Sequence, residues 1–207
     1  MHSEANVDIR FTESEESFRE EIREFLRTEL PDDWDPMGQG SPFSPGQFPF
    51  TKELSKKLAD KGWLTLAWPE EYGGQARSIM EQLVYREEMS YWGAPGTDLG
   101  VGAITWVGPT LMIAGTEEQK REHLPYIAEA ERYWCTLYSE PGSGSDLASL
   151  QTSATLDGDD YVINGQKIWT SAAHIADWGW LAARTDPDAP KHRGISLFLL
   201  DMKSPGV

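Results

Sequence analysis

The chain has 207 residues, of which 39% are hydrophobic and nine are tryptophan, a composition that indicates one or two folded domains and argues against general disorder. Its 18 basic and 34 acidic side chains give a net charge of −16, which disfavours binding to nucleic acid and to anionic membrane surfaces. No apolar run approaches the ~20 residues that a membrane-spanning helix needs, and the acidic first residues match neither a secretory signal nor a transit peptide. Because Cys135 is the single cysteine, a disulfide within the chain and a cysteine-cluster metal site are excluded, and we expect a cytoplasmic protein.

Apolar residues at helical spacing dominate the first part of the chain. Phe18 and Ile22, four positions apart, begin one face of the first helix, and Thr12 or Ser14 supplies its N-terminal cap. The pattern predicts a helical domain over residues 1–130. The helices that we expect span Glu15–Glu29, Thr51–Lys61, Ser78–Trp92, Leu99–Ala114 and Glu117–Glu131.

After residue 130 the pattern changes to short β-branched and aromatic runs with turn residues between them. Gly158-Asp159-Asp160 and Asn164-Gly165 are strong hairpin signals. Strands at intervals of roughly ten residues predict a small antiparallel, barrel-like β-domain over residues 131–207, so the expected fold class is α+β. Such a sheet left open would show an unprotected edge, and we interpret the chain as the front part of a longer polypeptide. The expected strands span Tyr133–Ser139, Thr152–Leu156, Tyr161–Asn164, Ile168–Ser171, Asp177–Arg184 and Gly194–Leu200.

The segment Tyr138–Asp146 carries the most chemical information. Its glycines let the backbone turn sharply and approach a ligand closely. Freed backbone N–H groups, with the hydroxyls of Ser143 and Ser145, could hold a pyrophosphate. A flexible surface turn explains the composition equally well. The segment matches neither a P-loop, which needs GK[ST], nor a Rossmann GxGxxG motif.

A second informative segment is Asn164–Ser171, which we expect to be a hairpin turn followed by a strand. Trp169 could cover the face of a flat cofactor, and Ser171 could donate a hydrogen bond to a ring nitrogen. Taken alone, the segment is better explained as an ordinary hairpin with a core tryptophan.

Together these segments resemble the acyl-CoA dehydrogenase family, and the resemblance covers nearly the whole chain. The motifs KHRGIS and DLASLQT are most similar to a bacterial branch that acts on steroid side chains and other bulky acyl-CoA esters. The motifs that carry the family resemblance are SEPGSGSD, DGDDYVINGQKIWTS, WLAARTDP, GISLFLLD, LAWPEEYGG and IAGTEEQKREHLP.

The resemblance implies a three-part fold, of which this chain has the N-terminal helical domain and the middle β-domain but not the C-terminal four-helix domain. It also implies that FAD binds between the β-domain and the C-terminal helices. The Tyr138 backbone and the Ser139 hydroxyl then face the flavin ring, Gly144 and Ser145 approach the pyrophosphate, and Ser171 lies near N5. The implied cofactor-binding residues are Tyr138, Ser139, Gly144, Ser145, Trp169, Thr170 and Ser171.

The implied reaction is α,β-dehydrogenation of an acyl-CoA thioester to the 2-enoyl-CoA, with hydride transfer to flavin N5. In the family a glutamate of the C-terminal domain removes the α-proton. No catalytic residue is therefore expected in this chain, and the isolated chain is expected to be inactive. Glu140 lies inside a motif, but we expect it to be structural, at the turn.

The family resemblance also implies substrate contacts and partners. The acyl pocket is lined by the helix expected at Leu99–Ala114, where Gly102 leaves room for a bulky acyl group, Trp106 forms a wall and Ser145 contacts the substrate. Close helix packing explains Gly102 equally well, and Trp106 could instead only fill the core. The implied partners are an electron-transfer acceptor protein and like or unlike subunits in a dimer or tetramer.

Two other interpretations stay open. One is a flavin oxidase or monooxygenase on the same fold, since oxygen reactivity depends on the absent C-terminal part. The other is a non-catalytic subunit that acts through assembly with a partner. The intact SEPGSGSD and WTS motifs argue against a decayed site.

Overall fold

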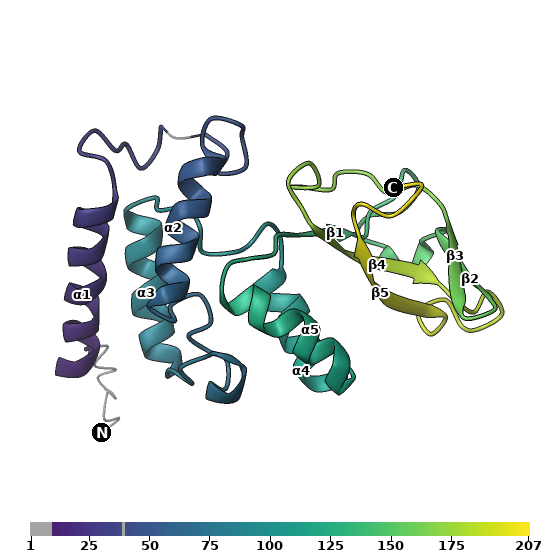
Figure 1. Ribbon diagram of the computed structural model, residues 1–207, viewed down its shortest axis with the longest axis horizontal. Coiled ribbons are helices and arrows are strands. Elements are labelled where there is room, and N and C mark those ends of the chain that lie inside the picture. Colours follow the sequence, from purple (N-terminus) through teal and green to yellow (C-terminus); the bar gives the residue numbers. More distant parts are fainter. Residues whose placement is uncertain (1–9, 39) are drawn as a thin grey trace, which may run out of the picture.

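The computed structural model describes residues 10–38 and 40–207, in which five α-helices precede five β-strands (Figure 1). A helical first part followed by a β-sheet confirms the expected α+β class. The helices are α1 Glu13–Glu29, α2 Phe48–Asp60, α3 Ile79–Tyr91, α4 Gly108–Ala114 and α5 Glu117–Ala128. The strands are β1 Trp134–Leu137, β2 Ser153–Asp157, β3 Asp160–Asn164, β4 Trp178–Arg184 and β5 Ile195–Asp201.

Three of the helices start at capping boxes, which explains why local sequence locates them well. At α1 the Thr12 hydroxyl accepts from the Glu15 N–H, and the Glu15 carboxylate accepts from the Thr12 N–H at 2.6 Å. Thr12, rather than Ser14, is therefore the cap. Ser78 and Thr116 serve α3 and α5 in the same way.

The expected helix over Leu99–Ala114 is wrong in its first part. Gly100 and Gly102 have φ values of +87° and +80°, outside the range of a right-handed helix. The half-buried Asp98 carboxylate accepts from the N–H groups of Leu99, Gly102 and Ile104, and a continuous helix would instead have bonded the Ile104 N–H to the Gly100 carbonyl. A π-helical turn at Ala103–Val107 then leads directly into α4.

The sheet is mixed rather than purely antiparallel, which corrects that part of the prediction. β4 lies at its centre, parallel to β1 and antiparallel to β5, and meets β2 at a single parallel pair. The β2–β3 hairpin turns at Gly158-Asp159 as expected. The expected hairpin at Asn164-Gly165 and the expected strand Ile168–Ser171 are both wrong, because residues 165–177 form an irregular loop.

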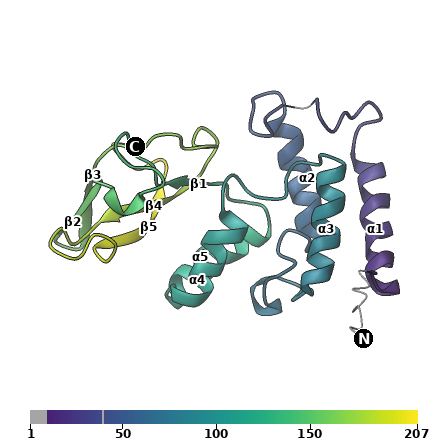
Figure 2. The same cartoon turned by 180° about the vertical axis from the view of Figure 1, so that it is seen from behind.

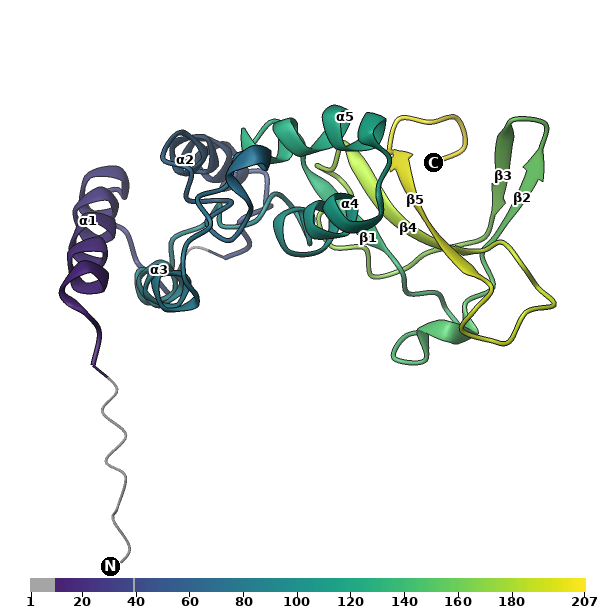
Figure 3. The same ribbon diagram turned by 90° about the horizontal axis from the view of Figure 1, so that it is seen from below.

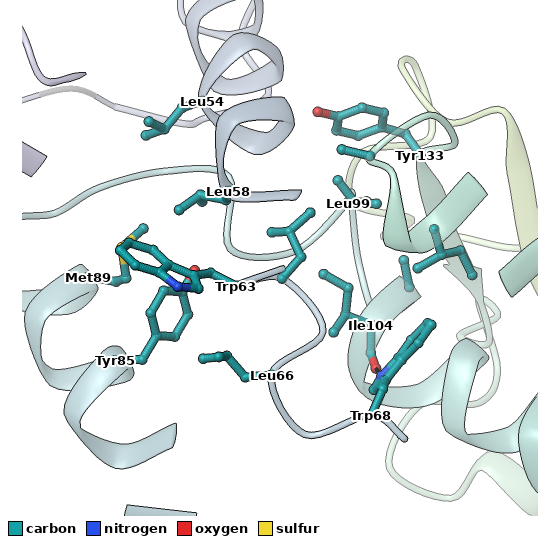
Figure 4. Close-up of a cluster of buried hydrophobic side chains, with 14 of the residues drawn as sticks. Leu54, Leu58, Trp63, Leu66, Trp68, Tyr85, Met89, Leu99, Ile104 and Tyr133 are labelled. Carbon is teal, nitrogen blue, oxygen red and sulfur yellow. Dashed lines mark hydrogen bonds between the residues drawn. The ribbon is translucent and has the colours of Figure 1, made fainter. Parts of the chain in front are cut away.

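The core continues from the helices into the sheet. In Figures 1, 2 and 3, α4 and α5 lie between the sheet and the group formed by α1, α2 and α3. Figure 4 shows part of the helical core, in which the Trp68 indole N–H donates to the Ile104 carbonyl at 3.1 Å. The His123 ring of α5 packs edge-on against Trp134 and Trp178, with centroid distances of 5.5 and 4.6 Å. The helical part and the sheet thus share one buried cluster.

The backbone before the π-turn also joins the sheet. The Trp134 N–H donates to the Leu99 carbonyl, and the Val101 N–H donates to the Trp134 carbonyl, each at 2.8 Å. A Cβ at Gly100 would lie 2.0 Å from the Trp134 carbonyl oxygen, so this close approach requires glycine. Within the described ranges, none of the helices is long and apolar enough to cross a bilayer.

Candidate functional site

Three segments that are distant in the sequence meet at the end of β1. The Ile168 N–H donates to the Ser139 carbonyl at 2.9 Å, and the Lys167 ammonium donates to the Tyr138 carbonyl at 3.1 Å. From the helical part, the Trp106 ring stacks on the Tyr138 ring with a centroid distance of 6.4 Å and an interplanar angle of 8°. The structure therefore brings Tyr138 and Ser139 next to the Lys167–Ser171 segment and to Trp106.

The buried side chain of Glu140 connects the segments that meet at the end of β1. Its buried carboxylate accepts from the Gln151 N–H at 2.6 Å, from the Thr152 N–H at 2.9 Å and from the Lys167 ammonium at 2.8 Å. Burial alone raises the pKa of Glu140, but the Lys167 ammonium and the hydrogen bonds outweigh it and lower the pKa to about 2. Glu140 is therefore a fully partnered anion at neutral pH, which confirms its expected structural role at the turn.

The segment after Lys167 has an unusual backbone. Trp169 and Ala172 have φ values of +57° and +64°, a left-handed conformation that is unfavourable for residues with a Cβ. The Trp169 side chain is 87% exposed, so the alternative of a core tryptophan is wrong. Among the described residues, the N–H groups of Trp169, Thr170 and Ser171 have no protein acceptor. The segment thus presents an indole face and a run of free donors.

Gly144 and Ser145 occupy a separate, exposed turn. Reciprocal hydrogen bonds between Glu140 and Ser143 close the base of that turn, at 2.8 and 3.1 Å. A Cβ at Gly144 would meet no atom within 4 Å. The turn and the Lys167–Ser171 segment are joined at the base of the turn, where the Lys167 ammonium donates to the Glu140 carboxylate at 2.8 Å.

Gly102 and Trp106 lie on the π-turn, and the structure places them differently from a simple pocket wall. Gly102 is buried, and a Cβ there would lie 2.6 Å from the Trp106 ring. A cavity of about 970 Å³ opens beside the π-turn, but Ile104 and Thr105 line it rather than Gly102 and Trp106. Aromatic residues from the helical part supply much of its wall, namely Trp34, Phe43, Trp63, Trp68 and Tyr85.

Sequence reasoning missed two residues that shape the site. Lys167 lies within one of the family motifs, but a lysine beside a predicted turn gives no sign that its side chain will be buried. Asp98 was not singled out, although it accepts the Gly102 and Ile104 N–H groups at the start of the π-turn that carries Trp106. An aspartate a few residues before small residues at a helix start was the available signal.

The comparisons with known proteins match both parts of the chain. The family model described as "Acyl-CoA dehydrogenase, N-terminal domain" matches residues 12–131, and "Acyl-CoA dehydrogenase, middle domain" matches residues 135–207. The curated relative acyl-CoA dehydrogenase FadE26 of Mycobacterium tuberculosis is 42% identical over 201 residues, which is 96% of this chain and 50% of that protein.

Solved structures give the same result. The steroid ACAD Tcur3481-Tcur3483 superposes with a TM-score of 0.86 at 43% identity, over 96% of this chain and 50% of that one. The ChsE4-ChsE5 complex from Mycobacterium tuberculosis superposes with a TM-score of 0.79 at 41% identity, over 95% of this chain and 48% of that one. This chain thus spans about half the length of the relatives it matches. Acyl-CoA dehydrogenases use FAD. The chain belongs to the acyl-CoA dehydrogenase family and carries its N-terminal and middle domains.

Proposed function

We propose that the protein containing this chain is a FAD-dependent acyl-CoA dehydrogenase that acts on a bulky, ring-bearing acyl thioester. The observation that carries the proposal is the Trp169–Ser171 segment, which combines an exposed indole with three N–H groups that have no protein acceptor, beside the end of β1. A flat heterocycle with several acceptor atoms is the ligand that such a surface suits.

The residues present fit FAD. The Trp169 indole offers an apolar face, and the hydroxyls of Ser139 and Ser171, with the free N–H groups, offer donors for the ring. Thr170 is half-buried and adds a further hydroxyl. The open turn at Gly144 and Ser145 suits the pyrophosphate, because nothing fills the space above Gly144. When bound, FAD supplies the acceptor for the hydride that leaves the β-carbon.

This chain's own residues orient and enclose rather than exchange protons. Glu140 cannot be the base that takes the α-proton, because its carboxylate is buried, ion-paired with Lys167 and held anionic at a pKa of about 2. A base poised near neutral pH needs an open face toward the substrate. We place the base in the C-terminal part that the relatives have and this chain does not span.

The proposed substrate class rests on the helical part and on the relatives. The cavity of about 970 Å³ beside the π-turn is large and aromatic-walled, which suits a fused-ring acyl group. A steroid ACAD is among the most similar solved structures. We further propose assembly with an unlike subunit, as in the ChsE4-ChsE5 complex, electron transfer to an acceptor protein, and a cytoplasmic site of action.

The test removes the proposed flavin contacts one at a time in the natural protein that contains this chain. Trp169→Ala should weaken FAD binding at least tenfold and shift the flavin absorbance, because a stacked face is lost. Ser171→Ala should weaken binding about fivefold, for a hydrogen bond worth about 1 kcal/mol. Gly144→Ala should leave thermal stability unchanged and weaken FAD binding by crowding the pyrophosphate.

The matched control is Tyr91→Ala, which removes another aromatic side chain that is 79% exposed, on α3. It should leave both FAD affinity and absorbance as they are. Unchanged FAD affinity in all three site variants would mean that this surface does not bind the cofactor.

A further inference from the structure

The ion pair between Glu140 and Lys167 is buried on both sides. The two side chains are only 6% and 8% exposed, and the ammonium lies 2.8 Å from the Glu140 carboxylate. Burying two charges costs free energy unless the geometry satisfies both. Here the carboxylate gains two backbone N–H donors, and the ammonium gains the Tyr138 carbonyl at 3.1 Å. The pair therefore ties together three segments, around Tyr138, Gln151 and Lys167.

The other ion pair in this half of the described chain is of a different kind. Lys191 and Asp146 are 54% and 62% exposed, and such surface pairs contribute little. Because a surface ion pair would satisfy the same two charges without a desolvation cost, the burial of the Glu140–Lys167 pair indicates that its role is to fix the positions of the segments it joins.

The position of the pair in the chain suggests what it places. Lys167 and Ile168 bind the carbonyls of two successive residues, Tyr138 and Ser139, and the backbone enters its left-handed conformation at the next residue, Trp169. A left-handed conformation at a residue with a Cβ persists only where the surroundings impose it. Two consecutive anchors immediately before Trp169 meet that requirement.

We propose that the Glu140–Lys167 pair is a positioning device that holds Trp169 and Ala172 in their left-handed backbone conformation and so keeps the Trp169 side chain exposed. Both side chains are buried, so we assign them a positioning role that acts through Trp169. The claim that this segment binds FAD rests on the proposed function, whereas the claim that the ion pair fixes the backbone of the segment does not.

The experiment compares three variants of the full chain. Lys167→Met removes the ammonium and keeps the apolar stem. Glu140→Gln/Lys167→Met removes both charges and leaves no unpaired buried charge, so it keeps the test decisive if the single variant does not fold. Lys191→Met, which breaks the exposed pair with Asp146, is the matched control.

The first measurement is amide hydrogen exchange without any ligand. We expect the Ile168 N–H to exchange at least tenfold faster in both Lys167 variants, while the core strand β4 exchanges as in the unmodified chain. The Lys191 variant should leave Ile168 unchanged. A uniform acceleration across the β-domain, or none at Ile168, would overturn the proposal, because the pair would then be a general stabiliser or dispensable.

The second measurement is the absorbance and circular dichroism of added FAD, in the natural protein that contains this chain. We expect the double variant to lose FAD affinity at least fivefold, with an altered visible spectrum, and the Lys191 variant to match the unmodified protein. A normal spectrum and affinity in a double variant whose Ile168 exchanges fast would overturn the link to Trp169. If the unmodified protein binds no FAD, the proposed function fails, and the exchange result still decides the placement.

Discussion

Two buried glutamates, one in the helical part and one in the β-domain, each form an ion pair with a basic side chain from another segment. Glu88 on α3 accepts from Arg19 and Arg23 of α1 at 2.9 to 3.0 Å, and its side chain is 5% exposed. Glu140 pairs with Lys167 and is 6% exposed. Burial alone raises the pKa of both carboxyls; the two arginines outweigh it at Glu88, and the Lys167 ammonium together with the hydrogen bonds outweighs it at Glu140, so both pKa values are lowered.

The difference lies in what each glutamate connects. Glu88 joins two helices that local sequence already specifies through a cap and an apolar face. Glu140 joins irregular segments whose conformation has no such local cause. A buried ion pair between helices thus fixes how finished elements pack, whereas one between loops helps to decide the backbone conformation itself.

The largest effect that we expect is from Glu88→Ala. It leaves the Arg19 guanidinium buried beside α3 without its most buried partner, which should lower the free energy of unfolding by about 3–5 kcal/mol. Urea unfolding measures this. Glu87→Ala is the control, since Glu87 binds the same arginine but is 46% exposed, and it should cost at most ~1 kcal/mol. Equal losses in the two variants would remove the distinction between a buried and a surface partner.

A smaller effect should appear as a pH dependence from Glu140. Its pKa falls from 4.5 to about 2 on folding, so its stabilisation is fully present above about pH 4.5 and is lost as the pH falls toward 2. Between pH 5 and pH 3 this amounts to about 2 kcal/mol of unfolding free energy. The double variant Glu140→Gln/Lys167→Met should lose that much less over the same interval than the unmodified chain. Parallel pH profiles would show that Glu140 titrates normally.

The smallest effect that we expect comes from the capping box that fixes the start of α1 in the helical part. Thr12→Ala removes the hydroxyl that accepts the Glu15 N–H, and it should cost about 1 kcal/mol. Ser14→Ala should stay within about 0.5 kcal/mol, because Ser14 is not the cap. Thermal unfolding of both variants checks the difference. A larger loss at Ser14 would mean that the start of α1 is set by something other than its capping box.

The sequence predicted those elements whose causes lie within a few residues. α1 begins at Glu13, within two residues of the expected start at Glu15. The agreement is close because the cap and the apolar face are both local signals. The β2–β3 turn at Gly158 was equally visible, since glycine supplies the φ of +66° that the turn needs. The change of hydrophobic period near residue 130 likewise predicted a helical part followed by a β-part, and the family resemblance agreed with it.

The remaining parts depend on contacts between distant residues. Ile168–Ser171 has the composition of a strand, but Lys167 and Ile168 are bonded to the distant Tyr138 and Ser139 carbonyls, and Trp169 has a left-handed φ of +57°. Leu99–Gly102 has helical spacing, yet it pairs with Trp134 instead. The cofactor and substrate roles of the site residues, and the boundary near residue 130, stay predictions.

The pairing of residues 99–101 with Trp134 has a consequence for exchanging parts between related enzymes. A cut between residues 131 and 135 separates the two family models, but it also leaves the Leu99 carbonyl and the Val101 N–H without their partners. The same cut also separates the His123 ring from the Trp134 and Trp178 rings that pack against it. A chimera that takes one domain from a relative should therefore keep its folding cooperativity only if residues 99–101, His123, Trp134 and Trp178 all come from the same parent.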